Sequence, residues 1–357
     1  MVKAPSLFLI WFVFFFLTAT GKTLPGSSLH FFAADDPLIQ YFGRVDFTNP
    51  LRPRFWQPGT YLDARFQGTS CGFIVGDQMQ GDNHNYLEIE VDDTLLYRLK
   101  LQRSTDTILV VKGLGDGPHK ILICKSTETI CGWLQFEGFL CRKLLSPPER
   151  PRRKMEFIGN SITCGARSDT REFSCTEGQW FDESNAYQSY GPITARTLGA
   201  QWVISAYSGI GLIHSCCGIP ITMPEIYGKT DQHNLDWDFS RYQPDVITIC
   251  LGQNDGIQDS TLFCGAYVNF IHQVRTANPH AVIICLSSPM ADSILAPVLK
   301  RYITGVVRFL QASGEKDIHS FFFSKRYYHS CYDHPNLEEH KEIAAELSPF
   351  IRSIMDW

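Results

Sequence analysis

The sequence predicts two folded parts in tandem: an N-terminal all-β jelly roll or β-sandwich, then an α/β part with a mostly parallel, doubly wound sheet and helices on both faces. Three observations predict this fold class. Short segments rich in β-branched and aromatic residues recur at regular spacing up to residue 145. A proline-rich, basic stretch follows at residues 146–153. Beyond it, short apolar runs alternate with longer amphipathic ones.

Length and composition are those of a globular protein that holds two domains. The chain has 357 residues, and a domain typically takes about 100–200. Apolar residues make up 44% of the chain and charged residues 19%, which excludes a wholly disordered protein. The net charge of −5 gives no basic excess that would attract a polyanion, so we expect no nucleic-acid partner.

The first 21 residues have the layout of a secretory signal peptide. Lys3 precedes an apolar run at residues 7–17, and small residues follow at 18–21. The run is shorter than the ~20 residues that a membrane span needs, which disfavours the alternative of a signal anchor. We therefore expect residues 1–21 to be removed and the protein to be secreted, without stable membrane association.

The N-terminal part, residues 30–145, is predicted to be all-β. Turn signals such as Gly68-Thr69 and the glycine-rich residues 113–118 separate its candidate strands. These strands are Tyr61–Phe66, Cys71–Val75, Tyr86–Val91, Leu95–Leu101, Thr107–Lys112, His119–Cys124 and Cys131–Phe139. Short strands at such regular spacing are typical of a sandwich or jelly roll.

The α/β part, residues 154–357, follows a predicted linker at residues 146–153, because prolines stiffen that stretch and exclude it from a sheet interior. Its apolar runs predict buried strands at Met155–Ile158, Trp202–Ala206, Val246–Leu251, Val282–Leu286 and Ile318–Phe323. Helices are predicted between and after them, at Ser184–Leu198, Leu262–Arg275, Ile294–Leu310 and Asn336–Ile354. Alternation of strand and helix predicts a parallel sheet with right-handed crossovers.

The chain has twelve cysteines, and export permits disulfides. Pairs that lie near one another along the chain are Cys124 with Cys131, Cys164 with Cys175, and Cys216 with Cys217. The sequence leaves the connectivity open, since spacing does not decide it. Cys250 and Cys285 lie inside apolar strand-like runs, so we expect them to be buried free thiols.

Chemically useful groups follow four of the predicted strands, where ligands bind in an open parallel sheet. Ser161 lies on a strand-to-helix turn that would hold its hydroxyl out of the sheet, as a nucleophile requires. Residues 208–211 carry two glycines that allow backbone N–H groups to approach an oxyanion, and the amide of Asn254 could donate to one. His334 precedes the last helix, where it could act as a general base.

Each of these motifs also has a structural interpretation when taken alone. Ser161 could simply cap the helix behind it, and a lone histidine is usually structural. Two further patterns resemble known motifs but lack residues or spacings that those motifs require. Residues 227–230 end like a phosphate-binding loop, but Met223 stands where its first glycine is required. The histidines and glutamates at 329–340 lack the spacing of a metal site, so we expect no metal and no cofactor.

In their order and spacing, the four motifs resemble blocks I, II, III and V of the SGNH (GDSL-like) hydrolases. The resemblance implies that the signature residues are Ser161, Gly209, Asn254 and His334. A jelly roll ahead of an SGNH-hydrolase domain is similar to carbohydrate esterase family 2, the acetylxylan esterase-like group. Residues 43–47, 68–70, 143–145, 208–212 and 237–239 look like that family, and the resemblance covers roughly residues 40–355.

Two positions depart from the pattern of that family. Asn160 precedes the serine, where the family usually has aspartate. The acid of the family commonly lies two or three residues before the histidine, and those positions hold Tyr332 and Cys331. The nearest carboxylate is that of Asp333. The resemblance therefore implies that Asp333 orients His334, through either its side chain or its backbone carbonyl.

The resemblance implies a secreted serine esterase that removes O-acetyl groups from carbohydrate through a Ser–His acyl-enzyme mechanism. The oxyanion would be held by the N–H groups of Ser161 and Gly209 and by the Asn254 amide. Aromatic residues that could stack on sugar rings, or else pack in the protein, are Trp180, Phe181 and Trp237. Two alternatives stay open: a secreted glycan-binding protein with an inactive hydrolase domain, and a general short-chain esterase or lipase. No oligomeric state is predicted.

Overall fold

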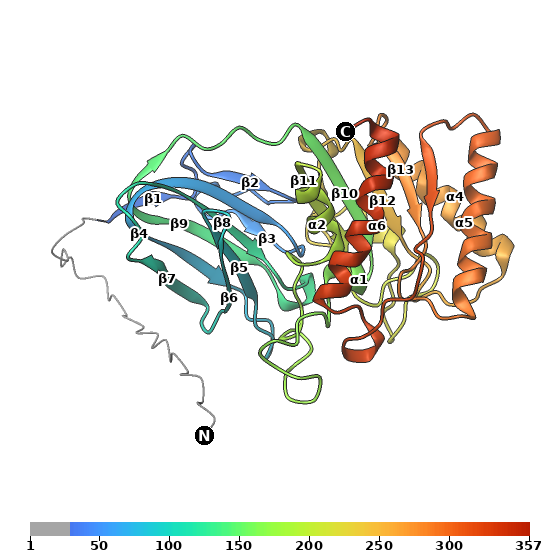
Figure 1. Ribbon diagram of the computed structural model, residues 1–357, viewed down its shortest axis with the longest axis horizontal. Coiled ribbons are helices and arrows are strands. Elements are labelled where there is room, and N and C mark those ends of the chain that lie inside the picture. Colours follow the sequence, from blue (N-terminus) through green and yellow to red (C-terminus); the bar gives the residue numbers. More distant parts are fainter. Residues whose placement is uncertain (1–28) are drawn as a thin grey trace, which may run out of the picture.

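A computed structural model describes residues 29–357 and shows a β part and an α/β part that lie side by side (Figure 1). The predicted signal peptide, residues 1–21, lies outside the described residues. Among residues 29–357, no helix combines the length and the apolar character needed to cross a lipid bilayer. The stretch predicted as a linker connects the last strand of the first part to the first strand of the second.

The N-terminal part is antiparallel, and its nine strands within the described residues belong to one strongly bent sheet. They are β1 (His30–Ala33), β2 (Gln40–Phe42), β3 (Arg54–Phe55), β4 (Tyr61–Asp77), β5 (Tyr86–Val91), β6 (Leu95–Lys100), β7 (Thr105–Lys112), β8 (Pro118–Lys125) and β9 (Leu134–Leu145). Large apolar side chains such as Phe66, Phe73 and Phe136 fill the space that the sheet encloses.

The strand β4 differs from its prediction in an informative way. Two strands, Tyr61–Phe66 and Cys71–Val75, were expected with a turn between them, but they form one continuous strand. Against β9, the register shifts between Gln67 and Cys71, so Gly68 marks a β-bulge instead of a turn. The first half of β4 pairs with β8 and the second half with β7. A single strand therefore pairs with different neighbours along its two halves.

The α/β part is a five-stranded parallel sheet in the order β11-β10-β12-β13-β14, which confirms the predicted fold class. Its strands are β10 (Arg153–Gly159), β11 (Ala200–Ala206), β12 (Val246–Cys250), β13 (Val282–Leu286) and β14 (Ile318–Phe321). Its helices are α1 (Ser161–Cys164), α2 (Tyr190–Thr197), α3 (Met223–Ile226), α4 (Ser260–Ala277), α5 (Leu295–Ala312) and α6 (Leu337–Met355). Short 3₁₀ turns occur at η1 (Thr129–Cys131), η2 (Phe239–Arg241) and η3 (Cys331–Asp333).

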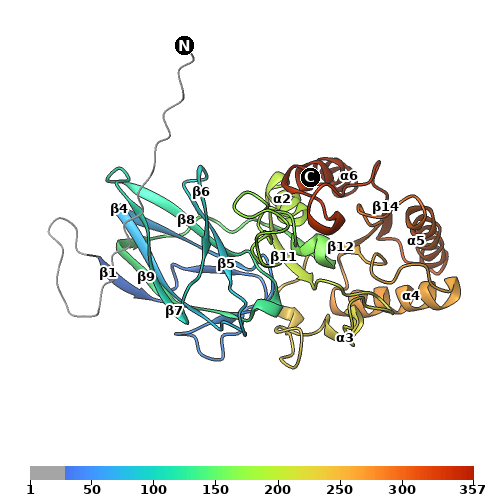
Figure 2. The same cartoon turned by 90° about the horizontal axis from the view of Figure 1, so that it is seen from below.

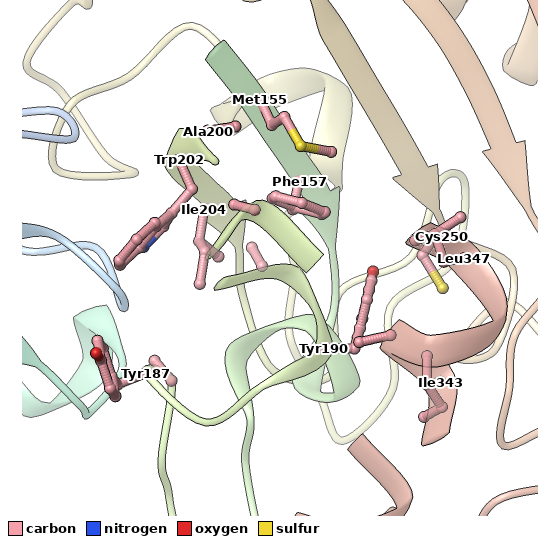
Figure 3. Packing of buried hydrophobic residues seen from close by; sticks show 14 of the residues in the cluster. Met155, Phe157, Tyr187, Tyr190, Ala200, Trp202, Ile204, Cys250, Ile343 and Leu347 are labelled. Atoms are coloured by element: carbon pink, nitrogen blue, oxygen red, sulfur yellow. The ribbon is translucent and has the colours of Figure 1, made fainter. Parts of the chain in front are cut away.

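Helices cover both faces of this sheet (Figure 2). One apolar cluster joins the sheet to α1, α2 and α6, and a second joins it to α3, α4 and α5. Phe157 of β10 belongs to the first cluster and Ile158 to the second. This follows because successive side chains of a strand point to opposite faces of the sheet. Figure 3 shows Phe157 among the first cluster, with Tyr190 of α2 and Leu347 of α6 nearby.

The helix predicted from Ser184 begins only at Tyr190. The preceding residues are held as a loop, because the buried Asn185 amide donates to the carboxylates of Glu88 and Asp169. Pro192 then lies in the first turn of α2, where a missing N–H costs no helical hydrogen bond. Long-range hydrogen bonds thus override the local helical pattern.

A buried ion pair joins the two parts of the protein. Arg44 of the β part and Glu156 of β10 are 1% and 3% exposed, and their charged groups lie 2.9 Å apart. Glu156 also accepts hydrogen bonds from Ser205 (2.6 Å) and Tyr227 (3.1 Å). Breaking such a pair typically costs about 3–5 kcal/mol, since a buried charge is left uncompensated. This contact therefore favours a fixed arrangement of the two parts.

The disulfides correct part of the cysteine analysis. Two are present among residues 29–357, Cys175–Cys331 and Cys216–Cys217. The candidate pair of Cys124 and Cys131 is wrong, because these side chains pack into different apolar clusters as buried free thiols. The pair of Cys164 and Cys175 is also wrong, since Cys164 is a buried free thiol. Of the pairs considered, Cys216–Cys217 is present, and the prediction of buried free thiols at residues 250 and 285 is confirmed.

The histidine of α6 that packs against α2 should make stability depend on pH. His340 is fully buried, its Nδ1 accepts the N–H of Tyr190 (3.2 Å), and burial lowers its pKa to about 3. The unfolded chain protonates this histidine below pH ~6.5, but the folded chain does not until about pH 3. Lowering the pH from 7 to 5 should therefore reduce the free energy of unfolding by about 2 kcal/mol through this group.

Urea denaturation at the two pH values measures this loss. His340→Gln is the matched control, because glutamine keeps an acceptor for the Tyr190 N–H but does not titrate. The variant should lose about 2 kcal/mol less than the wild type between pH 7 and pH 5. An equal loss of the free energy of unfolding in both proteins would contradict the attribution of this pH dependence to His340.

Candidate active site

Ser161 is presented by a tight connection between β10 and α1. A side chain at Gly159 would place its Cβ only 2.0 Å from Thr163 Oγ1, so this close approach requires glycine. Asn160 is the N-cap of α1, and its side chain accepts the N–H of Ile162 (3.1 Å). The interpretation of Ser161 as merely a helix cap is therefore wrong, and its hydroxyl makes a different contact.

That contact is with His334. The Nε2 atom of His334 lies 2.9 Å from Ser161 Oγ. On the other side of the ring, Nδ1 lies 3.0 Å from the carbonyl oxygen of Tyr332 and 3.2 Å from that of Cys331. Since carbonyls only accept, the neutral ring carries its proton on Nδ1 and presents the lone pair of Nε2 to the serine hydroxyl. This is the arrangement of a base and the group that it deprotonates.

The environment keeps His334 in its neutral form. Burial lowers the pKa of His334 below its ordinary value of 6.5, and the nearby Arg167 guanidinium lowers it further. The carbonyls of Tyr332 and Cys331 and the carboxylate of Asp333 act in the opposite direction. Because the pKa is lowered overall, the imidazole stays unprotonated and able to accept a proton at neutral pH.

The structure corrects the expectation that Asp333 orients the histidine. Its carboxylate lies 3.2 Å from Nη2 of Arg326, and the carbonyls that face the ring belong to Tyr332 and Cys331. The backbone explains the difference. Tyr332 and Asp333 both have left-handed φ angles, 54° and 59°, and the turn directs the preceding carbonyls at Nδ1 of His334.

Asp333→Asn should therefore change ester hydrolysis little. The carboxylate is exposed and its pair with Arg326 lies at the surface, where such a pair contributes about 0.2–1 kcal/mol. We expect kcat to stay within about fivefold of the wild type. Steady-state kinetics on an acetyl ester measures this. A loss of several hundredfold would instead show that the side chain acts on His334.

Two of the three predicted oxyanion donors, Gly209 and Asn254, follow the strands that lie on either side of β10, the strand that leads to Ser161. Strands β11 and β12 lie on either side of β10, so the loops carrying Gly209 and Asn254 end at the same edge of the sheet. Gly209 has φ +79°, and a Cβ there would lie 2.6 Å from Ile219 Cδ1. Nδ2 of Asn254 donates to the carbonyl of Ile210 (2.8 Å). An amide nitrogen has two N–H groups, so the second is available to a ligand.

Two acidic residues that the sequence analysis did not select hold the Gly209 loop in place. The buried Asp255 accepts the N–H groups of residues 212–214 at 2.7–3.0 Å. Glu128 of the β part accepts the N–H (2.9 Å) and the hydroxyl (2.7 Å) of Ser208. Burial raises the pKa of Glu128. Asp255 could have been noticed beside Asn254, but no local pattern singles out Glu128.

The aromatic residues considered for sugar stacking take part in packing. Phe181 is buried, with Trp180 packed against it edge-on. Trp237 is 8% exposed and lines a cavity of about 230 Å³ together with Gln201 and Tyr242. Those two residues lie at or before the amino ends of β11 and β12, whereas Ser161 follows the carboxyl end of β10. Trp237 is therefore at the opposite end of the parallel sheet from Ser161.

Comparison with known proteins agrees with this organisation. Residues 41–148 match the family model of the carbohydrate esterase 2 N-terminal domain, and residues 157–326 match the GDSL-like lipase/acylhydrolase family. The chain is 33% identical over 335 residues to cellulase/esterase CelE of Acetivibrio thermocellus, a match that covers 90% of this chain but 40% of CelE. It is 28% identical to an acetylxylan esterase/glucomannan deacetylase of Cellvibrio japonicus, over 96% of both chains.

A solved structure shows the same likeness over the whole fold. A family two carbohydrate esterase from Clostridium thermocellum, in complex with cellohexaose, has 33% sequence identity and a TM-score of 0.83, covering 89% of this chain and 99% of that one. A GDSL-like hydrolase part behind a β part of this kind defines a carboxylic ester hydrolase of the carbohydrate esterase class. The chain belongs to carbohydrate esterase family 2.

Proposed function

We propose that this protein removes O-acetyl groups from carbohydrate by a Ser–His mechanism. The observation that carries the proposal is the 2.9 Å contact between Ser161 Oγ and His334 Nε2, on a ring whose Nδ1 faces only carbonyls among its described partners. Relatives named as acetylxylan esterase and glucomannan deacetylase support the acetylated polysaccharide as substrate class. Residues 1–21 support secretion, and the two matched regions support the predicted division at residues 146–153.

The reaction proceeds in two halves. Nε2 of His334 takes the proton of the Ser161 hydroxyl while Oγ attacks the acetyl carbonyl carbon. The N–H groups of Ser161 and Gly209 and the free N–H of Asn254 hold the oxyanion of the tetrahedral intermediate. His334 then gives the proton to the sugar oxygen, and the bond from that oxygen to the acyl carbon breaks. Water, deprotonated by His334, then attacks the carbonyl carbon of the acetyl-serine. His334 returns this proton to Ser161 Oγ as the bond from Oγ to the acyl carbon breaks, and acetate is released.

The surface beside the site has room for a sugar. The residues that follow Gly209, between Ile213 and Thr222, line a hollow of about 530 Å³. Its backbone is tied to the site, since the N–H of Cys216 donates to the carbonyl of Gly209 (2.8 Å). A carbohydrate whose acetyl group reaches Ser161 could place a ring in this hollow.

Acetate release from acetylated xylan and acetylated glucomannan tests the proposal directly. The purified protein should release acetate from at least one of them and should hydrolyse p-nitrophenyl acetate much faster than the decanoate. Comparable rates on long acyl esters would favour a general esterase or lipase. Glycan binding without any ester turnover would favour the inactive, lectin-like alternative.

A further inference from the structure

The base of this site is oriented by a turn instead of an acid. The turn comprises residues 330–334, and we call it the His334 turn. Two consecutive residues in it, Tyr332 and Asp333, have left-handed backbone conformations. Such conformations are unfavourable for residues with a Cβ and persist where the surrounding structure holds them. The orientation of His334 therefore depends on whatever keeps this turn in shape.

The most substantial restraint on the His334 turn is covalent. Cys331, whose carbonyl oxygen is an acceptor for Nδ1 of His334, is bonded through its sulfur to Cys175, 156 residues earlier in the chain. The Cys331 side chain is buried, at 2% exposure. The other restraints are non-covalent, such as the hydrogen bond from the Ser330 hydroxyl to the carbonyl of Arg167 and the exposed ion pair of Asp333 with Arg326. The exposed Tyr332 side chain packs against the Arg167 guanidinium.

Cys175 belongs to a loop that is itself fixed to the β part. Asp182, near the end of this loop, contacts Lys100 (2.8 Å) and the hydroxyl of Tyr86 (2.6 Å). Asp169, near its start, lies 3.5 Å from Arg98 of the same β strand as Lys100. The disulfide therefore connects the His334 turn to a loop that is anchored on both sides of Cys175.

We propose that the Cys175–Cys331 disulfide is the positioning element of the catalytic histidine. It holds the carbonyls of Cys331 and Tyr332 against Nδ1 and so replaces the carboxylate that a catalytic triad would use. Cys331, three residues before His334, thus helps to orient the imidazole in two ways. Its sulfur anchors the turn through the disulfide, and its carbonyl oxygen accepts the proton of Nδ1. This inference rests on the proposed function, because it assigns the disulfide to the same Ser161–His334 pair.

Removing the exposed half of the bond is the first test. Cys175→Ser leaves Cys331 and the whole turn in sequence but frees the turn from its anchor. We expect kcat on p-nitrophenyl acetate to fall about 10- to 100-fold with KM little changed, as misplaced catalytic groups cause. Ser174→Ala alters the neighbouring exposed residue without touching the disulfide and should keep the wild-type kcat.

The ring itself provides a readout that needs no substrate. In protein with ¹⁵N-labelled histidine, His334 should show one tautomer, with the proton on Nδ1, and Cys175→Ser should show a mixture of the two. The His334→Gln variant assigns the signal. If the disulfide were purely structural, its removal in Cys175→Ser would lower the free energy of unfolding but leave both the tautomer of His334 and the kcat of the folded variant unchanged.

Chemical reduction of the disulfides in the native protein is an independent test. Dithiothreitol supplies two electrons and two protons, is itself oxidised to its cyclic disulfide, and converts Cys175–Cys331 into two thiols. Alkylation and peptide mapping then distinguish this bond from Cys216–Cys217. Loss of kcat should follow alkylation of Cys175.

The outcomes separate this inference from the proposed function. If the wild type hydrolyses no acetyl ester, the proposed function fails, and the tautomer experiment still judges the disulfide. If the wild type is active but full opening of Cys175–Cys331 leaves kcat and the tautomer unchanged, the positioning role is refuted.

Discussion

Ser161→Ala is expected to reduce kcat for acetyl ester hydrolysis by a factor on the order of 10⁶, the loss seen when a serine hydrolase loses its nucleophile. Without Oγ no acetyl-enzyme can form, and His334 can only assist a water molecule. A residual rate about 10³–10⁴ above the uncatalysed reaction should persist, because the oxyanion donors and the binding surface stay in place.

Acetate release and p-nitrophenyl acetate hydrolysis measure this loss. The fold of the variant should be unaffected, because Asn160 and not Ser161 caps α1, and the melting temperature checks this. Ser313→Ala at the exposed end of α5 is the matched control and should retain wild-type activity. Equal activity of the Ser161→Ala variant and the wild type would remove the Ser161–His334 pair from the mechanism.

Asn254→Ala is the second large expected effect. Loss of one oxyanion donor typically lowers kcat about 10²- to 10³-fold, or about 3–4 kcal/mol of transition-state stabilisation. The effect should fall on kcat and leave KM nearly unchanged, since the negative charge on the carbonyl oxygen develops only in the transition state. Part of the loss comes from the Ile210 carbonyl, which would lose its amide donor.

Gln253, which directly precedes Asn254, provides the control for the Asn254→Ala variant. Gln253 is also a half-buried amide after β12, but its oxygen accepts the hydroxyl of Ser288 (2.6 Å) and it has no assigned contact with the reacting group. Gln253→Ala should therefore lose much less kcat than Asn254→Ala in the same steady-state assay. Similar losses in the two variants would mean that the loop is disturbed as a whole and that Asn254 is not a specific donor.

The chemistry-bearing residues were predictable because parallel strands impose a common geometry. Ser161, Gly209 and Asn254 each follow a buried apolar run, and the carboxyl ends of parallel strands meet at one edge of a sheet. The order β11-β10-β12 then places the Gly209 and Asn254 loops on either side of Ser161. The contact expected between Ser161 and His334 is present at 2.9 Å.

Features that depend on local periodicity could be predicted from the order of the residues alone: the change from consecutive strands to alternating strands and helices, the strands of the parallel sheet, and the motifs at their ends. Four features became visible only in the folded chain: the continuous strand β4, the late start of α2, the Cys175–Cys331 bond and the carbonyls that orient His334. All four have the same cause. Each is set by groups distant along the chain or by backbone conformation within a turn, and neither leaves a periodic trace in the order of the side chains.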